Sequence, residues 1–97
     1  MVWLYIVQCR DGAFYTGTTR RSLEERVGEH NAGLFDGFTA KRRPVRLVFA
    51  QDFENPVDAI AAERQIKKWS RTKKQALIDG RFDLLVSLAK RVGERRG

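Results

Sequence analysis

The chain has 97 residues, of which 42% are hydrophobic and 32% are charged, and its formal net charge is +7. This size suits one globular domain with one modest core, so we expect a single domain over residues 1–97. No apolar run approaches the roughly 20 residues that a membrane-spanning helix requires. With one cysteine and one histidine, an internal disulfide and a zinc finger are both excluded.

The start of the chain and the lone Cys9 indicate a cytoplasmic protein. Residues 1–7 are too short for a signal peptide and lead directly into strand-like sequence. A single thiol without a partner fits a reducing compartment. We therefore expect a cytoplasmic protein with no membrane association, and the sequence indicates no obligate protein partner.

The excess of positive charge indicates a polyanion as partner, because Lys and Arg contacts release the counterions condensed on nucleic acid. Solubility alone would also account for a basic composition. The distribution of the cations strengthens the nucleic-acid interpretation, with DNA as the expected partner and RNA as a possibility, because they lie in two clusters. The clusters are Lys41, Arg42, Arg43 and Arg46, and then, with no acid between them, Arg64, Lys67, Lys68, Arg71, Lys73 and Lys74.

The first two strands are predicted to form a hairpin. Residues 2–9 (VWLYIVQC) are apolar at both parities, as in a strand covered on both faces. Residues 10–12 (RDG) supply a turn, and residues 14–18 (FYTGT) are rich in aromatic and β-branched side chains.

The loop length of this hairpin decides where its two tyrosines lie. A two-residue turn would place Tyr5 and Tyr15 on opposite faces of the sheet. A three-residue loop, with Gly12 in the left-handed region, would pair Tyr5 with Gly17 and Val7 with Tyr15. The phenols would then share a face, roughly 7–8 Å apart at the backbone, and Gly17 would leave space opposite Tyr5. We favour this second register.

A first helix is expected over residues 23–31. Ser22 is its predicted N-cap, and Glu25 completes a capping box. Asn31 and Gly33 are expected to end it. Leu23, Val27 and His30 lie on one stripe of this helix, beside Arg26.

The remaining elements follow a polar loop over residues 34–43. Residues 44–53 (PVRLVFAQDF) read as a third strand, in which Val45, Leu47 and Phe49 alternate with Arg46 and Val48. Asn55-Pro56 opens a helix that reaches residue 68 or 69. A shorter helix over residues 72–78 ends at Asp79-Gly80, and a last amphipathic helix covers about residues 82–92.

The predicted order is β-β-α-β-α-α-α. A three-stranded sheet of this size needs helices packed against it for stability. We therefore expect an α+β fold with a core over about residues 1–78.

Glu63 stands out because it is an acid on the apolar stripe formed by Ile60 and Ile66. A carboxylate there is costly to bury unless a cation accompanies it. One interpretation is a partly buried glutamate paired with an arginine. The other is a metal ligand, since one carboxylate together with waters and phosphate oxygens suits Mg²⁺.

Four other side chains have both an ordinary and a chemical interpretation. Arg26 is either a solvated helix arginine or a fork that binds a scissile phosphate. His30 is either a satisfied core histidine or a group that orients water or shares a proton with a tyrosine. Tyr5 and Tyr15 are ordinary strand aromatics or, if paired on one face, a base that needs a nearby cation to ionise.

The order and spacing of these side chains resemble the pattern of the GIY-YIG nuclease superfamily. The chain is similar to the small stand-alone bacterial members of that superfamily. The resemblance covers residues 1–77. Trp3, Leu4 and Thr16 replace Gly, Ile and Ile of the family name, while the tyrosines and Gly17 remain. The matching positions are Tyr5, Asp11-Gly12, Tyr15-Thr16-Gly17, Arg26-x-x-x-His30-Asn31-x-Gly33, Arg42-Arg43-Pro44-Val45 and Glu63-x-x-Ile66-Lys67-x-Trp69-Ser70.

The resemblance implies a three-stranded antiparallel sheet flanked by helices, with one divalent metal ion, Mg²⁺ or Mn²⁺, held by Glu63. It implies that Tyr5 or Tyr15 helps to activate water, that Arg26 steadies the phosphate and that His30 supports the site. It also indicates DNA repair or mobile-element processing as the setting. The expected nucleic-acid contacts are Asn31, Lys41, Arg42, Arg43, Lys67, Lys68, Arg71, Lys73 and Lys74.

We therefore expect a metal-dependent DNA endonuclease with little intrinsic sequence specificity, either structure-selective or related to repair. The alternative is a nucleic-acid-binding module with weak or no catalysis, which the basic clusters fit equally well. A third interpretation, an RNA- or ribosome-associated accessory protein, gives no reason for Glu63 on an apolar stripe.

Overall fold

The computed structural model describes residues 1–35 and 37–81. The chain divides into two compact units, residues 1–67 and residues 68–97. The helix expected at residues 82–92 lies outside the described residues, and the assignment of residues 1–97 to one domain stays a prediction. No helix in the described part of the chain is long and apolar enough to cross a membrane.

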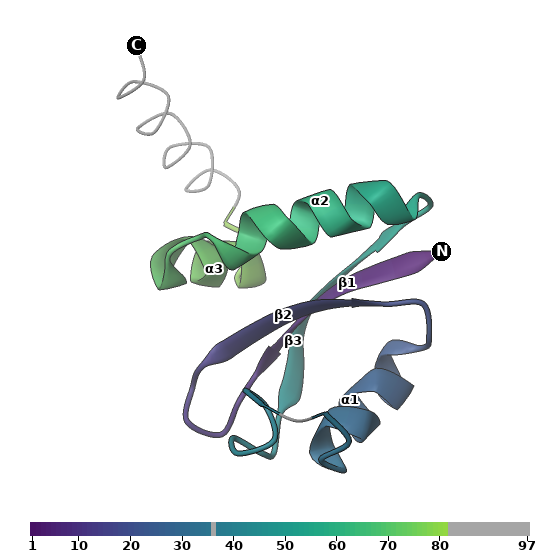
Figure 1. Ribbon diagram of the computed structural model, residues 1–97. Coiled ribbons are helices and arrows are strands. Elements are labelled where there is room, and N and C mark those ends of the chain that lie inside the picture. The colour runs from purple at the N-terminus through teal and green to yellow at the C-terminus, as the bar shows by residue number, and fades with distance from the viewer. Residues whose placement is uncertain (36, 82–97) are drawn as a thin grey trace. The chain divides into compact units, whose positions relative to one another are not determined.

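The first unit contains a three-stranded antiparallel sheet and two helices, which confirms the predicted α+β fold (Figure 1). The sheet order is β2-β1-β3, so the first strand is central. The described part of the second unit holds helix α3 (Arg71–Ile78). The elements of the first unit are β1 (Val2–Gln8), β2 (Phe14–Thr19), α1 (Leu23–Asn31), β3 (Arg46–Phe53) and α2 (Pro56–Lys67).

The hairpin adopts the register with the three-residue loop. The backbone N–H of Cys9 donates to the carbonyl of Ala13 at 2.8 Å, and Gly12 between them has φ +88°. A left-handed residue at this point is what a three-residue hairpin loop requires. Tyr5 consequently pairs with Gly17, and both tyrosines project from the same face.

The central strand is buried on both of its faces because α1 and α2 lie on opposite sides of the sheet (Figure 1). On the α1 side, Tyr5, Val7 and Cys9 form one cluster, against which Leu23 and Val27 of the helix pack. The alternate residues of β1 are equally buried, and α2 packs against the sheet with its own apolar residues. These are Leu4 and Ile6 on the strand and Ala59 and Ile66 on the helix.

The first helix begins and ends as its sequence predicts. Ser22 is the N-cap, as predicted, and its hydroxyl accepts from the backbone N–H of Glu25 at 3.1 Å. The carboxylate of Glu25 accepts from this hydroxyl at 3.1 Å, and not from the backbone N–H of Ser22 as in the predicted capping box. Ala32 is the C-cap, and Gly33 follows with φ +75°. This short helix is therefore fixed at both ends, which sets the position of His30 in its last turn.

Three predicted details are wrong. The third strand begins at Arg46 and not at Pro44, and a bulge interrupts its alternation, since Ile6 pairs with Phe49 but Val7 pairs with Leu47. Leu47 is consequently exposed. The buried stripe of α2 also differs, because Ile60 is 42% exposed. The stripe runs through Ala59, Glu63 and Ile66, which are spaced i, i+4 and i+7.

Gly17 lies directly beneath the ring of Tyr5. A Cβ added there would lie 2.7 Å from Oη and 2.8 Å from Cζ of Tyr5. Because this ring is buried and hydrogen-bonded, it cannot move aside at low cost, so Gly17→Ala should lower the free energy of unfolding by about 1–3 kcal/mol.

Gly28→Ala is the matched control, since Gly28 lies inside α1 with no atom within 4 Å of its added Cβ. It should raise the free energy of unfolding by roughly 0.5–1 kcal/mol. Urea denaturation of both variants checks the pair, and a Gly17→Ala protein as stable as the native chain would contradict the close contact.

Candidate active site

Two phenols and an imidazole meet on the α1 face of the sheet. The ring centroids of Tyr5 and Tyr15 lie 6.5 Å apart, and the ring of His30 lies 5.9 Å from the first and 5.3 Å from the second. Tyr5 is only 2% exposed, whereas Tyr15 is partly exposed. Solvent therefore reaches the cluster at Tyr15, and Tyr5 forms its floor.

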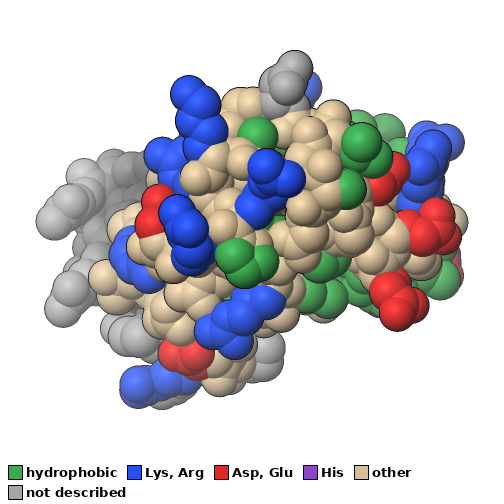
Figure 2. Space-filling view, turned by 90° about the horizontal axis from the view of Figure 1, so that it is seen from below, with side chains coloured by type: hydrophobic (Ala, Val, Ile, Leu, Met, Phe, Trp, Pro, Cys, Tyr) green, Lys and Arg blue, Asp and Glu red, His purple; other side chains and the backbone are tan. Residues whose placement is uncertain are grey.

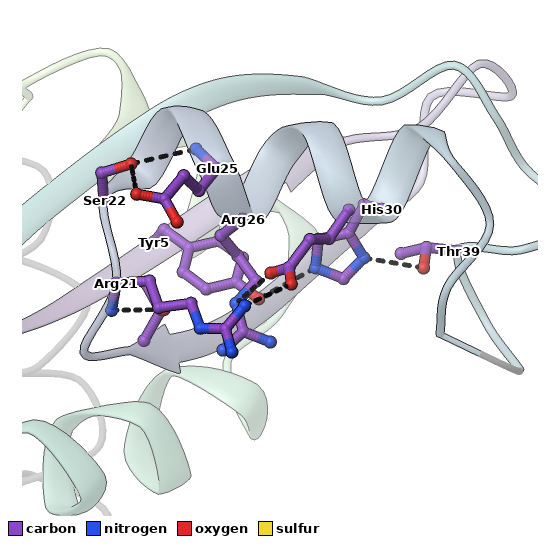
Figure 3. Close-up of polar contacts among 9 residues, drawn as sticks. Tyr5, Arg21, Ser22, Glu25, Arg26, His30 and Thr39 are labelled. Atoms are coloured by element: carbon purple, nitrogen blue, oxygen red, sulfur yellow. Dashed lines mark hydrogen bonds and ion pairs between the residues drawn. The ribbon is translucent and has the colours of Figure 1, made fainter.

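His30 is held from both sides (Figure 3). Its Nε2 lies 2.9 Å from the hydroxyl of Tyr5, and its Nδ1 lies 2.9 Å from Oγ1 of Thr39. A neutral imidazole has one N–H, so one nitrogen donates and the other accepts. The direction of the bond to Thr39 therefore fixes the direction of the bond to Tyr5.

Arg26 lies between an aromatic ring and a carboxylate. Its guanidinium carbon is 4.9 Å from the centroid of Phe35, and its Nε is 3.7 Å from Oε1 of Glu29. That separation is too long for a hydrogen bond, and both atoms are buried without one. The other oxygen of Glu29 accepts from Arg21 at 2.8 Å. Arg21 thus offsets the charge of Glu29 and leaves Arg26 with donors that an anion can take.

Glu63 is partly buried on α2, with its side chain 17% exposed. Its carboxylate pairs with Nζ of Lys67 at 2.9 Å, one helical turn away. The cation that accompanies the buried acid is therefore a lysine and not the arginine expected for the ordinary interpretation. No group of three or more His, Cys, Asp or Glu close enough to hold a metal occurs among the described residues.

The protonation of Tyr5 reflects its surroundings. Burial raises the pKa of the Tyr5 phenol, and Tyr15 raises it further. Arg26 lowers this pKa, whereas the carboxylates of Glu63 and Glu29 raise it. Arg26 on α1 and Glu63 on α2 thus shift the pKa of the same phenol in opposite directions, although the two helices lie on opposite sides of the sheet.

The imidazole of His30 is kept neutral. Burial lowers its pKa, the positive charge of Arg26 lowers it further, and Glu29 opposes the shift. A neutral ring suits its place between two hydroxyl groups, because it can accept from one of them and donate to the other.

The loop after α1 contributes three side chains that the sequence analysis did not select. Thr39 is 3% exposed and completes the His30 contacts. The ring of Phe35 lies 4.7 Å from that of His30, and Phe38 stacks beside Tyr15 at 6.3 Å. Hydroxyl and aromatic residues in a predicted polar loop gave no signal of these contacts, because only the tertiary fold brings the loop back to the helix.

The predicted nucleic-acid contacts of the first unit are already engaged in several ways. The amide of Asn31 donates to the carbonyl of Val45 at 3.0 Å and accepts from its N–H at 2.7 Å, so it ties the loop to the strand. Arg42 binds the carboxylate of Asp11 at 3.0 Å and lies over the ring of Phe38. These contacts are structural, and phosphate binding by these residues stays a prediction.

The other predicted contacts lie on the surface of the two units. Lys41 is exposed, and Arg43 donates to the carbonyls of Ala40 and Asn31. In the face shown in Figure 2, Lys and Arg side chains are spread across the surface and acids interrupt them at its edges. Lys67 belongs to the first unit, and the remaining residues belong to the second, where Lys73 lies over the ring of Trp69. The second-unit residues are Lys68, Arg71, Lys73 and Lys74.

Comparisons with known proteins show the family of the chain. The family model for the GIY-YIG catalytic domain matches residues 1–76. UPF0213 protein SSP2268 of Staphylococcus saprophyticus is 42% identical over 76 residues, which cover 78% of this chain and 92% of that protein. UPF0213 protein YazA of Bacillus subtilis is 40% identical over 77 residues, which cover 79% of this chain and 77% of that protein.

A solved structure has the same fold. The solution NMR structure of protein EF2693 from E. faecalis has 38% sequence identity and a TM-score of 0.57 to this chain. The match covers 84% of this chain and 85% of that one.

Removal of the Thr39 hydroxyl should destabilise the protein. Thr39→Val keeps the shape of the side chain but leaves Nδ1 of His30 buried without a partner, so we expect a loss of about 1–3 kcal/mol. Thr39→Ser retains the hydroxyl and should stay closer to the native chain. Urea denaturation measures both, and equal losses would show that the methyl group matters and the hydrogen bond does not.

Stability should fall as the pH is lowered through the ordinary pKa of histidine, near 6.5. Because the folded state lowers the pKa of His30, the unfolded chain takes up the proton first, so the contribution of this residue is present above that value and lost below it. His30 is the single histidine, which makes the assignment simple.

His30→Gln should remove this part of the pH dependence. Urea midpoints measured between about pH 8 and pH 5 would be compared for the two proteins. Parallel curves for the native chain and the variant would contradict a lowered pKa.

Proposed function

The chain belongs to the GIY-YIG superfamily, and on that premise we propose that it is a divalent-metal-dependent DNA endonuclease that hydrolyses phosphodiester bonds. The family assignment supports nuclease activity and a nucleic-acid substrate in general. Choice of DNA, metal dependence and weak sequence preference belong to the proposal. So do a role in DNA repair and a cytoplasmic setting, in which buried Cys9 would stay reduced.

The observation that carries the proposal is the cluster of Tyr5, Tyr15, His30 and Arg26 on one face of the sheet. A buried hydrogen-bonded phenol, a solvent-reached phenol and a guanidinium with free donors converge there. A scaffold that only bound nucleic acid would need surface cations and no such buried polar contacts. Groups that move protons and groups that bind an oxyanion are both available.

Glu63 is the proposed ligand of the divalent ion. Its carboxylate is partly buried and accepts from the ammonium of Lys67, an exposed side chain that would have to move aside or share the carboxylate with the ion. One carboxylate with waters and phosphate oxygens is a donor set that Mg²⁺ or Mn²⁺ accepts. When bound, the ion would act as a Lewis acid that polarises the phosphate and offsets its developing charge.

The protein's own residues would perform the remaining steps. Arg26 would bind a non-bridging oxygen of the scissile phosphate through its guanidinium and offset charge in the transition state. Tyr15, the phenol that solvent reaches, would act as a phenolate and take the proton of the attacking water while the water oxygen bonds to phosphorus. The P–O bond to the leaving oxygen of the strand would break, and that oxygen would take a proton from solvent water. Tyr5 and His30 would hold the floor of the site, so that Tyr15 and Arg26 keep fixed positions.

Weak sequence preference follows from the kinds of contact available. Guanidinium and ammonium groups contact phosphates, which carry no sequence information. The protein would therefore select its DNA substrate by shape and not by base sequence. Branched DNA is the first substrate to compare with plain duplex DNA.

The proposal is tested with supercoiled and branched DNA in Mg²⁺ or Mn²⁺. Glu63→Gln should abolish detectable nicking, and Glu24→Gln, an exposed acid of α1, is the matched control. Mn²⁺ should broaden the amide NMR signals near residue 63 in the native chain and not in Glu63→Gln. Cleavage that persists in excess chelator would remove the metal from the proposal.

Arg26→Ala should reduce kcat on the order of 100- to 1000-fold, as expected when one transition-state donor is lost. DNA affinity should fall far less, because many other cations remain. Arg10→Ala, an exposed arginine of the hairpin turn, controls for the loss of one charge. Binding that depends on salt with no cleavage under any of these conditions would favour the alternative, a nucleic-acid-binding module.

A further inference from the structure

A pocket of about 350 Å³ lies beside the proposed catalytic cluster and shares Arg26 with it. Its walls come from the start of β1, the end of β2 with the two residues after it, and the starts of α1 and α2, all within the first unit. Neither the basic clusters of the sequence nor the catalytic cluster includes its other residues. The pocket is thus a separate cavity next to the position proposed for the scissile phosphate.

Three arginines line one side of this pocket, Arg20, Arg21 and Arg26. Glu29 is the acid that pairs with two of them, at 2.8 Å from Arg21 and 3.7 Å from Arg26. Arg20 is exposed and has no side-chain partner among the described residues. The arginine side therefore has a surplus of positive charge, with Arg20 unengaged and ready to bind an anion.

The pocket also has an apolar wall. It is formed by Val2, Pro56 and Ile60. Ile60 remains 42% exposed and Val57, next to Pro56 in the chain, is 69% exposed. Inorganic phosphate would gain nothing from such a wall, whereas a sugar or a base would cover it.

We propose that this pocket binds the nucleotide adjacent to the scissile phosphate on the DNA strand. Arg20 and Arg21 would contact its phosphate, and Pro56 and Ile60 would cover its sugar or base. The size of the cavity suits a ligand of nucleotide size, since small-molecule pockets begin at about 300 Å³. This assignment rests on the proposed function, because it takes Arg26 as the group that binds the scissile phosphate.

Arg26 would then have neighbours on both sides along the strand. One side is the phenol cluster, where the bond is cut, and the other is the pocket, where the flanking nucleotide is held. Arg21 has a second effect there, since its ion pair with Glu29 keeps that carboxylate from repelling the incoming phosphate. The pocket would therefore position the strand as well as add affinity.

Binding is tested without cleavage by titrating deoxythymidine 3′,5′-bisphosphate into the native protein in the presence of a chelator. Amide NMR signals of Thr18, Thr19 and Ile60 should shift, because these residues line the pocket. Arg20→Ala should weaken binding about tenfold, the effect of one charge-assisted phosphate contact. Ile60→Ser should weaken it less, and Arg10→Ala should leave it unchanged.

Arg20 and Ile60 are both exposed, so Arg20→Ala and Ile60→Ser should fold. Circular dichroism checks the folding of both variants. Shifts confined to other surfaces would overturn the proposal. An equal affinity of Arg20→Ala and Arg10→Ala would also overturn it.

Cleavage of a short oligonucleotide separates this inference from the proposed function. If the enzyme cuts DNA, Arg20→Ala should raise KM with little change in kcat, because the residue contacts the flanking nucleotide and not the reacting atoms. An unchanged KM would overturn the pocket and leave the nuclease. Pocket binding of the bisphosphate without any cleavage would instead remove the nuclease and leave a nucleotide-binding site.

Discussion

The contact of Tyr5 with Gly17 below it and with His30 above it determines the arrangement of the site. Only a residue without a side chain allows the phenol to lie flat across the neighbouring strand. The phenol in that position reaches the imidazole at 2.9 Å, and the imidazole reaches Thr39 at the same distance. Strand pairing, helix position and the return of the loop are thus linked by one buried line of polar atoms.

A second series of polar side chains runs from the residue before the N-cap of α1 onto the helix. Arg21, Glu29 and Arg26 form an arginine-carboxylate-arginine series, in which one guanidinium makes the short contact and the other does not. The acid holds both side chains near the sheet, and only one of them neutralises it well. The guanidinium of Arg26 is therefore partly buried, and its Nε has no hydrogen-bond acceptor. Buried donors in structural ion pairs are ordinarily hydrogen-bonded.

Much of the fold and part of the site could be predicted from the sequence. The favoured hairpin register had Gly12 in the left-handed region and Gly17 opposite Tyr5, because local rules govern turns. The start of the first helix was predicted from Ser22 and Glu25, and its end from Asn31 and Gly33. The grouping of Tyr5, Tyr15 and His30 followed from that register and from helical spacing. The hairpin and the helix cap depend on residues that are close along the chain, whereas His30 meets Tyr5, 25 positions away, because α1 packs on the sheet.

What could not be predicted depends on contacts between distant segments. The bulge in the third strand places Leu47 towards solvent. The sequence of this strand contains no signal that predicts a bulge. The buried stripe of α2 passes through Ala59 and not through Ile60, since hydrophobic periodicity could not separate neighbouring positions on so short a helix. Thr39 was missed because the sequence does not distinguish a threonine that contacts His30 from other polar residues in a loop. Only the folded position of the loop shows this contact.

The two hydrogen bonds between Asn31 and the backbone of Val45 join the end of the first helix to the approach of the third strand. They close the intervening segment into a loop whose base is fixed independently of its tip. Natural variants could therefore change the exposed side chain of Lys41 in that loop, while Phe38 beside Tyr15 and Thr39 on His30 stay as they are. Related proteins would then be able to differ in the ligand contacts of this loop while the cluster of Tyr5, Tyr15 and His30 keeps its arrangement.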